Sequence, residues 1–212
     1  MNKKSVILMG GGGHCLSVID VIESTNLYKI EGIIDKPELI GSSLSGYGYI
    51  AKDEDLPEIV SKNVAFVITV GQLKSNSVRL KLFNLLDSLN ADFATIISPT
   101  AYVSKYAEIG KGSVVMHKSF VNAGTVIGNN CIINTGALVE HSCKIGNHCH
   151  ISTNAVVNGD VCIEDHSFIG SSAVIKNGVI IMNNSIIGAG SVVIRDTDPG
   201  DVLVGNPARK IN

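Results

Sequence analysis

Two groups of residues have types and spacings that can do chemistry, and the first is a glycine run near the amino terminus. Gly10 to Gly13 separate an apolar segment from a segment with helical character. Glycines between a strand and a helix let backbone amides approach a phosphate, and the helix dipole adds to the attraction. Asp35 follows Gly13 by 22 residues, where a carboxylate can meet a ribose or a base. We predict a diphosphate site, although Cys15 replaces the third glycine of a dinucleotide fingerprint; an empty, tight strand-to-helix turn is the alternative.

The second group is centred on His141. An imidazole changes its protonation state near neutral pH and can act as a general base. His141 follows the apolar Val139 by two residues, at a point where the repeat described below predicts a corner. An exposed histidine without a catalytic role is the alternative. Zinc enzymes built on β-helices use a pair of histidines separated by four residues, and none of the six histidines forms such a pair, so no metal site is predicted.

A strict six-residue repeat must position His141. Isoleucine or valine occupies every sixth residue from Ile97 to Val193, at seventeen positions in succession. A period of six fits neither a strand nor an α-helix, so the chain has to turn once per repeat. The pattern predicts a parallel β-helix in which three hexads make one triangular coil of 18 residues. A β-sandwich offers no reason for such a period.

Other positions of the hexad carry further predictions. The residues two before each isoleucine or valine are small or β-branched and should also point inward. Glycine or asparagine often follows the isoleucine or valine, and we expect a positive φ at these corners. These residues are Gly110, Asn122, Gly128, Asn134, Gly146, Asn158, Gly170 and Gly188. Cys131 and Cys149, like His148 and His166, are 18 residues apart and should stack about 4.8 Å apart along the axis.

The first 97 residues lack the repeat and alternate strand and helix patterns. Strands are predicted at 5–9, 28–34, 65–70 and 92–97, and helices at 16–23, 55–61 and 77–89. This order predicts a small α/β domain with a Rossmann-like βαβ unit over residues 1–97, whose ligand should lie at the carboxyl ends of the strands. Residues 98–212 then form the all-β helix and a short carboxyl-terminal tail. A dehydrogenase is disfavoured, because the first domain is about half of a full dinucleotide fold.

Composition narrows the partners. The net charge is −2 and no basic stripe is present, so nucleic acid is not an expected partner. No stretch approaches 18 consecutive apolar residues, and the apolar run after the first lysines is too short for a signal peptide. We therefore expect no membrane association and a cytoplasmic location. The five scattered cysteines indicate free thiols in a reducing compartment.

Taken together, several motifs resemble one known family, the bacterial sugar acetyltransferases of the sialic acid O-acetyltransferase and nucleotide-4-aminosugar N-acetyltransferase type. The resemblance covers essentially the whole chain. In order, the motifs are Gly12-Gly13-His14, Asp35, Val70-Gly71 with Arg79 beyond, Ser98-Pro99, Val139-Glu140-His141, Ile145-Gly146, His150-Ile151 and Gly205-Asn206-Pro207-Ala208.

The resemblance implies a left-handed β-helix that forms a homotrimer, with acetyl-CoA between neighbouring β-helices and a nucleotide sugar on the amino-terminal domain. It implies that His141 is the general base, that Asn134 positions the reacting groups and that His150 contacts the acetyl end of the cofactor. Gly159, Ser171 and Ala189 would lie along the rest of acetyl-CoA. Contacts to the nucleotide sugar would come from Gly12, Gly13, His14, Asp35, Lys36 and Gly71.

Two departures from the family pattern leave the chemistry open. Many members carry an acid directly after the catalytic histidine, whereas this chain has Ser142, and many carry a second acid where this chain has Lys36. Our hypothesis is N-acetylation of the 4-amino group of a nucleotide-linked 4-amino-4,6-dideoxy sugar by direct transfer in a ternary complex, for surface glycan biosynthesis. O-acetylation of a sialic acid or related sugar is the main alternative, and a noncatalytic scaffold is a weaker one.

Overall fold

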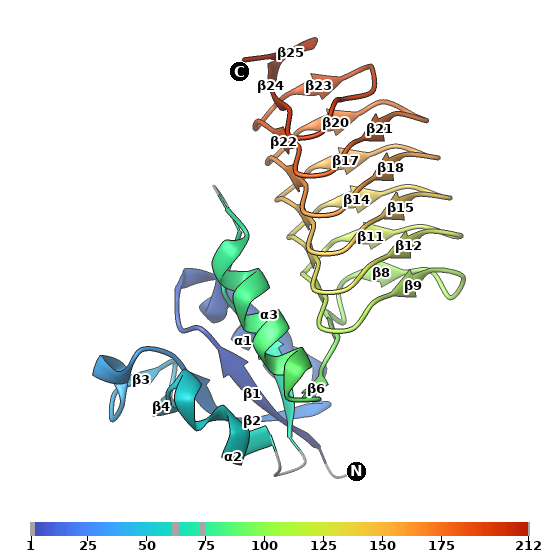
Figure 1. Ribbon diagram of the computed structural model, residues 1–212. Coiled ribbons are helices and arrows are strands. Elements are labelled where there is room, and N and C mark those ends of the chain that lie inside the picture. The colour runs from blue at the N-terminus through green and yellow to red at the C-terminus, as the bar shows by residue number, and fades with distance from the viewer. Residues whose placement is uncertain (1–2, 61–63, 73–74, 212) are drawn as a thin grey trace. The chain divides into compact units, whose positions relative to one another are not determined.

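The computed structural model describes residues 3–60, 64–72 and 75–211. It divides into two compact units, Met1–Ile96 and Ile97–Asn212, and Figure 1 labels the elements of both. Among the described residues, none of the helices has the length and hydropathy needed to cross a bilayer.

The amino-terminal unit is built on a mixed sheet with the strand order β3-β4-β2-β1-β5-β6. Its strands are β1 (Lys4–Met9), β2 (Tyr28–Ile34), β3 (Ser43–Leu44), β4 (Tyr47–Ala51), β5 (Ala65–Ile68) and β6 (Asp92–Phe93). Neighbouring strands are parallel except for the β3–β4 hairpin, which the sequence did not predict. The chain passes from β1 to β2 on one side and later adds β5 on the other. The ligand crevice of such a sheet opens at the carboxyl end of β1.

Helices cover both faces of this sheet. They are α1 (Gly13–Thr25), α2 (Leu56–Val60) and α3 (Ser77–Ser88), with short 3-10 turns η1 (Pro37–Leu39) and η2 (Asp53–Asp55). Residues of α2 and α3 share one buried cluster with Ile7 and Met9 of β1. Alternate residues of a strand point to opposite faces, so Val6 and Leu8 face the side that α1 covers.

The predicted helices and strands are confirmed with shifted ends. α1 starts at Gly13, three residues earlier than predicted, and β5 ends at Ile68. The strand predicted at 92–97 is two strands, β6 and β7 (Ile96–Ile97). Ser61, the last residue of the helix predicted at 55–61, lies outside the described residues.

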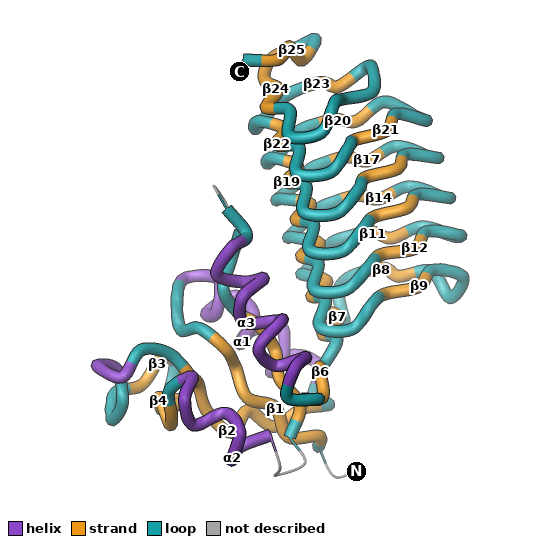
Figure 2. The backbone as a smooth tube through the Cα atoms, viewed as in Figure 1, coloured by secondary structure: helices purple, strands orange, loops and turns teal. Residues whose placement is uncertain are grey.

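The second unit is a parallel β-helix with three faces, each a stack of two-residue strands (Figure 2). Face 1 contains β7, β10 (Val114–Val115), β13 (Ile132–Ile133), β16 (His150–Ile151), β19 (Phe168–Ile169), β22 (Ile186–Ile187), β24 (Val202–Gly205) and β25 (Ala208–Lys210). Face 2 contains β8 (Tyr102–Val103), β11 (Phe120–Val121), β14 (Leu138–Val139), β17 (Val156–Val157), β20 (Val174–Ile175) and β23 (Val192–Val193). Face 3 contains β9 (Glu108–Ile109), β12 (Val126–Ile127), β15 (Lys144–Ile145), β18 (Cys162–Ile163) and β21 (Ile180–Ile181).

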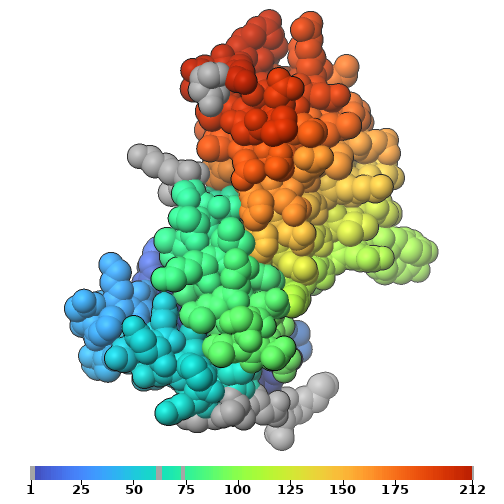
Figure 3. Space-filling model, in the orientation of Figure 1, coloured from blue at the N-terminus to red at the C-terminus, as the bar shows by residue number. Residues whose placement is uncertain are grey.

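Neighbouring strands of a face pair in parallel with a register of 18 residues, as in Val114 with Ile132. Successive coils therefore stack in register, and Figure 3 shows them as bands from yellow to red. Turns of adjacent coils form columns along three edges. Edge 1/2 carries Thr135, Thr153, Ser171 and Ala189, edge 2/3 carries Ala123, His141, Gly159 and Asn177, and edge 3/1 carries Asn129, Asn147, Asp165 and Asn183.

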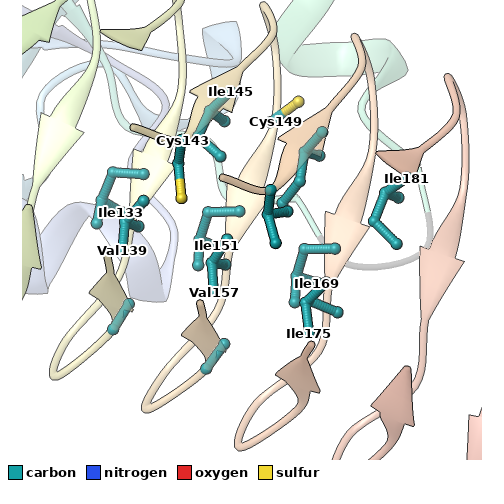
Figure 4. Close-up of a cluster of buried hydrophobic side chains, with 14 of the residues drawn as sticks. Ile133, Val139, Cys143, Ile145, Cys149, Ile151, Val157, Ile169, Ile175 and Ile181 are labelled. Carbon is teal, nitrogen blue, oxygen red and sulfur yellow. The ribbon is translucent and has the colours of Figure 1, made fainter. Parts of the chain in front are cut away.

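The six-residue pattern correctly predicted the interior of the β-helix. Every isoleucine or valine of the repeat from Val115 to Val193 is buried, and so are the small residues two positions earlier from Ser113 to Ser191. Figure 4 shows how the branched side chains of successive coils pack against one another, with Cys143 and Cys149 among them. Cys131 and Cys149 are both fully buried, and all five cysteines are free thiols.

The ends of the β-helix differ from the regular coils. Ile97 is 36% exposed, whereas its neighbour Ile96 is buried, and Val103 and Ile109 are half-buried, because no earlier coil stacks beneath them. At the other end, the predicted tail is an antiparallel hairpin of β24 and β25. Leu203 of β24 belongs to the buried core cluster, and Lys210 Nζ lies 2.6 Å from Asp201 Oδ1.

The prediction of a positive φ directly after each isoleucine or valine was wrong. The positive φ occurs two residues later, for example at Ser142 (60°) and His166 (64°), so Asn134 is not a left-handed corner residue. The glycines of the predicted set serve close packing instead. A Cβ on Gly128 would lie 2.7 Å from the backbone carbon of Gly146 in the next coil, which leaves room only for hydrogen.

Candidate functional site

The glycine run contains two kinds of glycine. Gly10 has φ +100°, and a Cβ on it would collide with Val70 Cγ2, so the fold itself requires this glycine. A Cβ on Gly11 would collide with the ring of Tyr49. Gly12 and Gly13, in contrast, have nothing within 4 Å of the position of a Cβ. Packing within the described chain therefore gives no reason for these two glycines, and both are exposed at the start of α1.

The predicted nucleotide-sugar residues of the amino-terminal unit lie together at the carboxyl ends of β1, β2 and β5. Gly71 follows β5, and a Cβ on it would lie 3.5 Å from His14 Cβ in the first turn of α1. Asp35 directly follows β2, and its neighbour Lys36 is exposed. Because Gly12 and Gly13 begin the same helix, a ligand there would meet backbone N–H groups at the positive end of α1.

Asp35 has a structural task that the sequence did not reveal. Its Oδ2 accepts the Gly11 N–H at 2.6 Å and its Oδ1 accepts the Lys36 N–H at 2.7 Å. The hydroxyl of Tyr49 donates to Gly11 O at 3.2 Å. Asp35 and Tyr49 therefore hold the glycine run in place from two sides. Tyr49 was missed because nothing in the sequence links β4 to the glycine run.

Cys15, which replaces the third glycine of the fingerprint, is fully buried in α1. Burial raises the pKa of its thiol to about 11, a hydrogen bond with Thr69 lowers it, and the charge of Asp35 raises it. The thiol therefore stays protonated near neutral pH, and Cys15 packs α1 onto the sheet instead of acting as a nucleophile.

His141 lies, as predicted, in the turn between β14 and β15, and its side chain is exposed. Its Nδ1 lies 3.4 Å from Ser142 Oγ, a long contact for a hydrogen bond. On the coil above, a Cβ on Gly159 would lie 2.7 Å from both Cε1 and Nε2 of the imidazole. The ring thus rests on the backbone of Gly159, and this glycine, expected to contact acetyl-CoA, makes room for His141.

Asn134 and His150, predicted separately, lie on neighbouring coils of face 1 and contact each other. Asn134 Oδ1 accepts the Thr135 N–H at 2.8 Å, which orients the amide so that Nδ2 donates to His150 Nε2 at 3.1 Å. The His150 ring is buried and meets Phe168 edge-on at 5.2 Å. With Nε2 accepting, the imidazole is neutral and carries its proton on Nδ1.

One chain does not bring all the predicted β-helix residues together. His141 and Gly159 lie on edge 2/3, whereas Ser171 and Ala189 lie on edge 1/2, across the width of face 2. Ser171 Oγ is 3.0 Å from Ser152 Oγ on the same edge. A hollow of about 580 Å³ over face 3, lined among others by Lys144 and Cys162, contains none of the predicted residues.

The remaining β-helix histidines have other surroundings. His148 and His166 stack as predicted on edge 3/1, with ring centroids 5.1 Å apart and planes 5° from parallel. His117 lies on edge 1/2, where its Nδ1 is 2.7 Å from Ser98 Oγ in the first coil. Within the described ranges, no group of three or more His, Cys, Asp or Glu side chains is arranged to share a metal ion.

Comparison with known proteins places this arrangement in a family. A model of the PglD N-terminal domain matches residues 5–86, and a model of bacterial transferase hexapeptide repeats matches residues 124–159 and 160–195. The acetyltransferase domain of PglB from Neisseria gonorrhoeae is 30% identical, with a TM-score of 0.90 over 99% of this chain and 100% of its own. This chain belongs to the PglD-type nucleotide-sugar N-acetyltransferases with hexapeptide repeats. Its β-helix is therefore the left-handed kind.

Two further members of this family are informative. PerB from Caulobacter crescentus, solved with CoA and GDP-perosamine, is 30% identical, with a TM-score of 0.91 over 98% of this chain and 97% of its own. A second structure of this enzyme has a histidine replaced by alanine. UDP-N-acetylbacillosamine N-acetyltransferase of Bacillus subtilis is 35% identical over 114 residues, which are 53% of this chain and 51% of the relative, so the match spans about half of that protein.

Proposed function

We propose that this protein transfers an acetyl group from acetyl-CoA to the amino group of a nucleotide-linked amino sugar, specifically the 4-amino group of a 4-amino-4,6-dideoxy sugar. The PglB domain has been solved with acetyl coenzyme A, and PerB with CoA and GDP-perosamine. Both relatives align with nearly the whole of this chain. The observation that carries the proposal is the exposed imidazole of His141, held on a turn by the backbone of Gly159.

In this proposal His141 is the general base of a direct transfer. The amine nitrogen attacks the thioester carbonyl carbon, which forms the C–N bond and places negative charge on the carbonyl oxygen. The imidazole takes the proton that the nitrogen must lose. Collapse of the tetrahedral intermediate breaks the C–S bond, and the imidazolium returns the proton to the departing thiolate. The products are the acetamido sugar and CoA, and backbone amides near the cleft would stabilise the oxyanion.

The amino-terminal unit would hold the nucleotide. Gly12 and Gly13 leave open space where a Cβ would stand, so a diphosphate can approach their backbone N–H groups closely. His14 and Gly71 border the same crevice, and Asp35 with Lys36 would lie on the side of the base. Both oxygens of Asp35 already accept backbone N–H groups, and a carboxylate keeps capacity for a further donor.

Acetyl-CoA would lie between two copies of the β-helix. The residues assigned to it by resemblance lie on edge 1/2 or next to it on face 1, as Asn134 and His150 do, whereas His141 is on edge 2/3. A transfer site that uses both sets therefore needs edge 2/3 of one copy beside edge 1/2 of another. Cyclic association of identical chains produces such unlike contacts, and a homotrimer suits a three-sided β-helix.

Face 2 joins these two edges and has the composition of a covered surface. The first residue of each strand points outward, and on face 2 all of these residues are apolar: Tyr102, Phe120, Leu138, Val156, Val174 and Val192. On face 3 the same positions include Glu108 and Lys144. In sedimentation or light scattering we expect about three times 22.3 kDa, and a monomer at micromolar concentration would contradict the trimer.

The acceptor test follows release of the CoA thiol with matched acceptors. We expect turnover with nucleotide-linked 4-amino-4,6-dideoxy sugars and none with the corresponding 4-hydroxy sugars. An amine is favoured because it is intrinsically more nucleophilic than an alcohol, and Ser142 gives the imidazole no adjacent acid. Turnover with free sialic acid and none with nucleotide amino sugars would replace this proposal by O-acetylation.

A further inference from the structure

The residue before His141 is unusual within its own column. On edge 2/3, the position that directly follows each face 2 strand carries a carboxylate in one coil. From the first coil onward, the residues at this position are Ser104, Asn122, Glu140, Asn158, Lys176 and Ile194. The catalytic family pattern has an acid after the histidine, whereas here the acid at the turn precedes it.

Glu140 is folded onto the turn that bears His141. Its Oε2 accepts the backbone N–H of His141 at 3.2 Å and the side-chain amide of Asn122, one coil below, at 2.7 Å. Glu140 is half-buried, so these bonds are only partly screened by water. The sequence suggested that Glu140 points away from His141 because it assumed an extended segment. The strand ends at Val139, and the turn brings the carboxylate back to the histidine backbone.

The rest of the turn is fixed by the coils on either side. Thr125 Oγ1 donates to Glu140 O at 2.6 Å and accepts the Cys143 N–H at 3.2 Å. Ser142 N donates to Ala123 O in the coil below at 3.0 Å, and His141 O accepts the N–H of the coil above at 3.1 Å. The backbone N–H of His141 is the remaining donor of this turn, and Glu140 takes it.

We propose that Glu140 is a positioning residue for His141, acting through the histidine backbone and not through its ring. The inference rests on the proposed function, since it assumes that His141 is the base. A hydrogen bond to a carboxylate is about twice as strong as one between neutral groups, so it fixes the turn against rotation. The negative charge on the same turn also favours the imidazolium that forms during transfer. Glu140 thereby replaces the missing acid without contacting the imidazole.

Asp165 provides a matched control on edge 3/1. Its Oδ1 accepts the Asn147 N–H from the coil below at 2.7 Å, and it is half-buried like Glu140. Removing either carboxylate therefore takes one charge-assisted hydrogen bond from a turn of the same β-helix. Only the Glu140 bond leads to His141.

The experiment compares Glu140→Ala, Glu140→Gln and Asp165→Ala in the full chain. We expect Glu140→Ala to lower kcat by at least tenfold while the KM for acetyl-CoA changes less than about twofold, a loss of roughly 1.4 kcal/mol in the transfer step. Glu140→Gln keeps an acceptor without the charge and should recover most of that loss. Asp165→Ala should leave kcat unchanged. A kcat for Glu140→Ala within twofold of the parent, or an equal loss in Asp165→Ala, overturns the proposal.

A spectroscopic readout separates this proposal from the proposed function. In Glu140→Ala the His141 amide proton should move upfield and exchange with solvent at least tenfold faster, whereas Glu140→Gln should stay close to the parent. If no nucleotide amino sugar is acetylated, the proposed function fails, and the amide signal still reports whether Glu140 holds the turn. An unchanged His141 amide in Glu140→Ala overturns the positioning role whatever the substrate.

Discussion

The β-helix presents histidines on two of its edges with opposite consequences. On edge 3/1, His148 and His166 stand on successive coils and stack at 5.1 Å, so each ring covers the other. On edge 2/3, the coil above His141 carries Gly159, and the ring lies against bare backbone with its side chain exposed. The same turn geometry therefore gives a packed pair in one column and an accessible base in the other. The deciding factor is the residue 18 positions later.

The largest test of this contrast replaces one histidine on each edge. His141→Ala should lower kcat by about 10²–10⁴-fold, the usual contribution of a general base, with acetyl-CoA binding retained. His148→Ala should leave kcat unchanged, because its ring packs against His166 away from edge 2/3. Steady-state kinetics with titration calorimetry for CoA measure both. Near-normal turnover in His141→Ala would remove this residue from the mechanism.

The next test fills the space beneath the ring. In Gly159→Ala the new Cβ would stand 2.7 Å from Cε1 and Nε2 of His141, so the ring has to move. A displacement of about 1 Å from the reacting atoms lowers rates by up to about 10²-fold, and we expect a fall in kcat of between tenfold and that value. Asn177→Ala, one coil higher in the same exposed column, is the control. Full activity in Gly159→Ala would show that the ring position does not matter.

A smaller effect is expected from restoring the acid that relatives carry. Ser142 has φ 60°, a conformation that aspartate tolerates and that Asp160 adopts at the equivalent turn above. In Ser142→Asp a carboxylate replaces the hydroxyl 3.4 Å from His141 Nδ1 and gains about 1 kcal/mol over a neutral hydrogen bond. We expect kcat to rise by about fivefold, and Ser142→Ala not to exceed the parent. No increase would mean that Glu140 already supplies what the acid would add.

The smallest effect on turnover belongs to edge 3/1. Asn130 is fully buried, has φ 54° and contacts His148 Nδ1 through its Nδ2 at 3.0 Å. Asn130→Ala loses this hydrogen bond and places alanine in a left-handed turn, so the free energy of unfolding should fall by about 2 kcal/mol. Denaturation with urea measures the loss, while kcat at 25 °C should stay constant. A fall in kcat with unchanged stability would mean that both edges serve catalysis.

Part of the site was readable from the sequence because it follows from spacing. The six-residue period predicted which residues fill the interior, which pairs stack at 18 residues and that His141 stands at a turn. It failed on φ, because the period does not say which residue of the turn is left-handed. Gly110 and its equivalents looked like corner glycines, whereas they are small because the next coil passes too close for a Cβ.

Contacts between distant segments were not predictable in the same way. The glycine run gave no sign that Gly10 and Gly11 serve packing while Gly12 and Gly13 face open space. The bond from Asp35 to Gly11 N joins residues 24 positions apart, and Tyr49 reaches the same glycine from β4. Such contacts depend on how strands are ordered in a sheet, which local patterns do not specify.

The sequence by itself determined the β-helix, its interior and the types of group available for chemistry, because a repeat of six apolar positions can be buried in few ways. The tertiary structure decided what those groups do. It set the imidazole of His141 on Gly159, turned Glu140 back onto the histidine backbone, and separated Ser171 and Ala189 from His141 by the width of face 2. Stacking in register brings residues 18 positions apart into contact, and side chains at a turn settle only against the coils on either side.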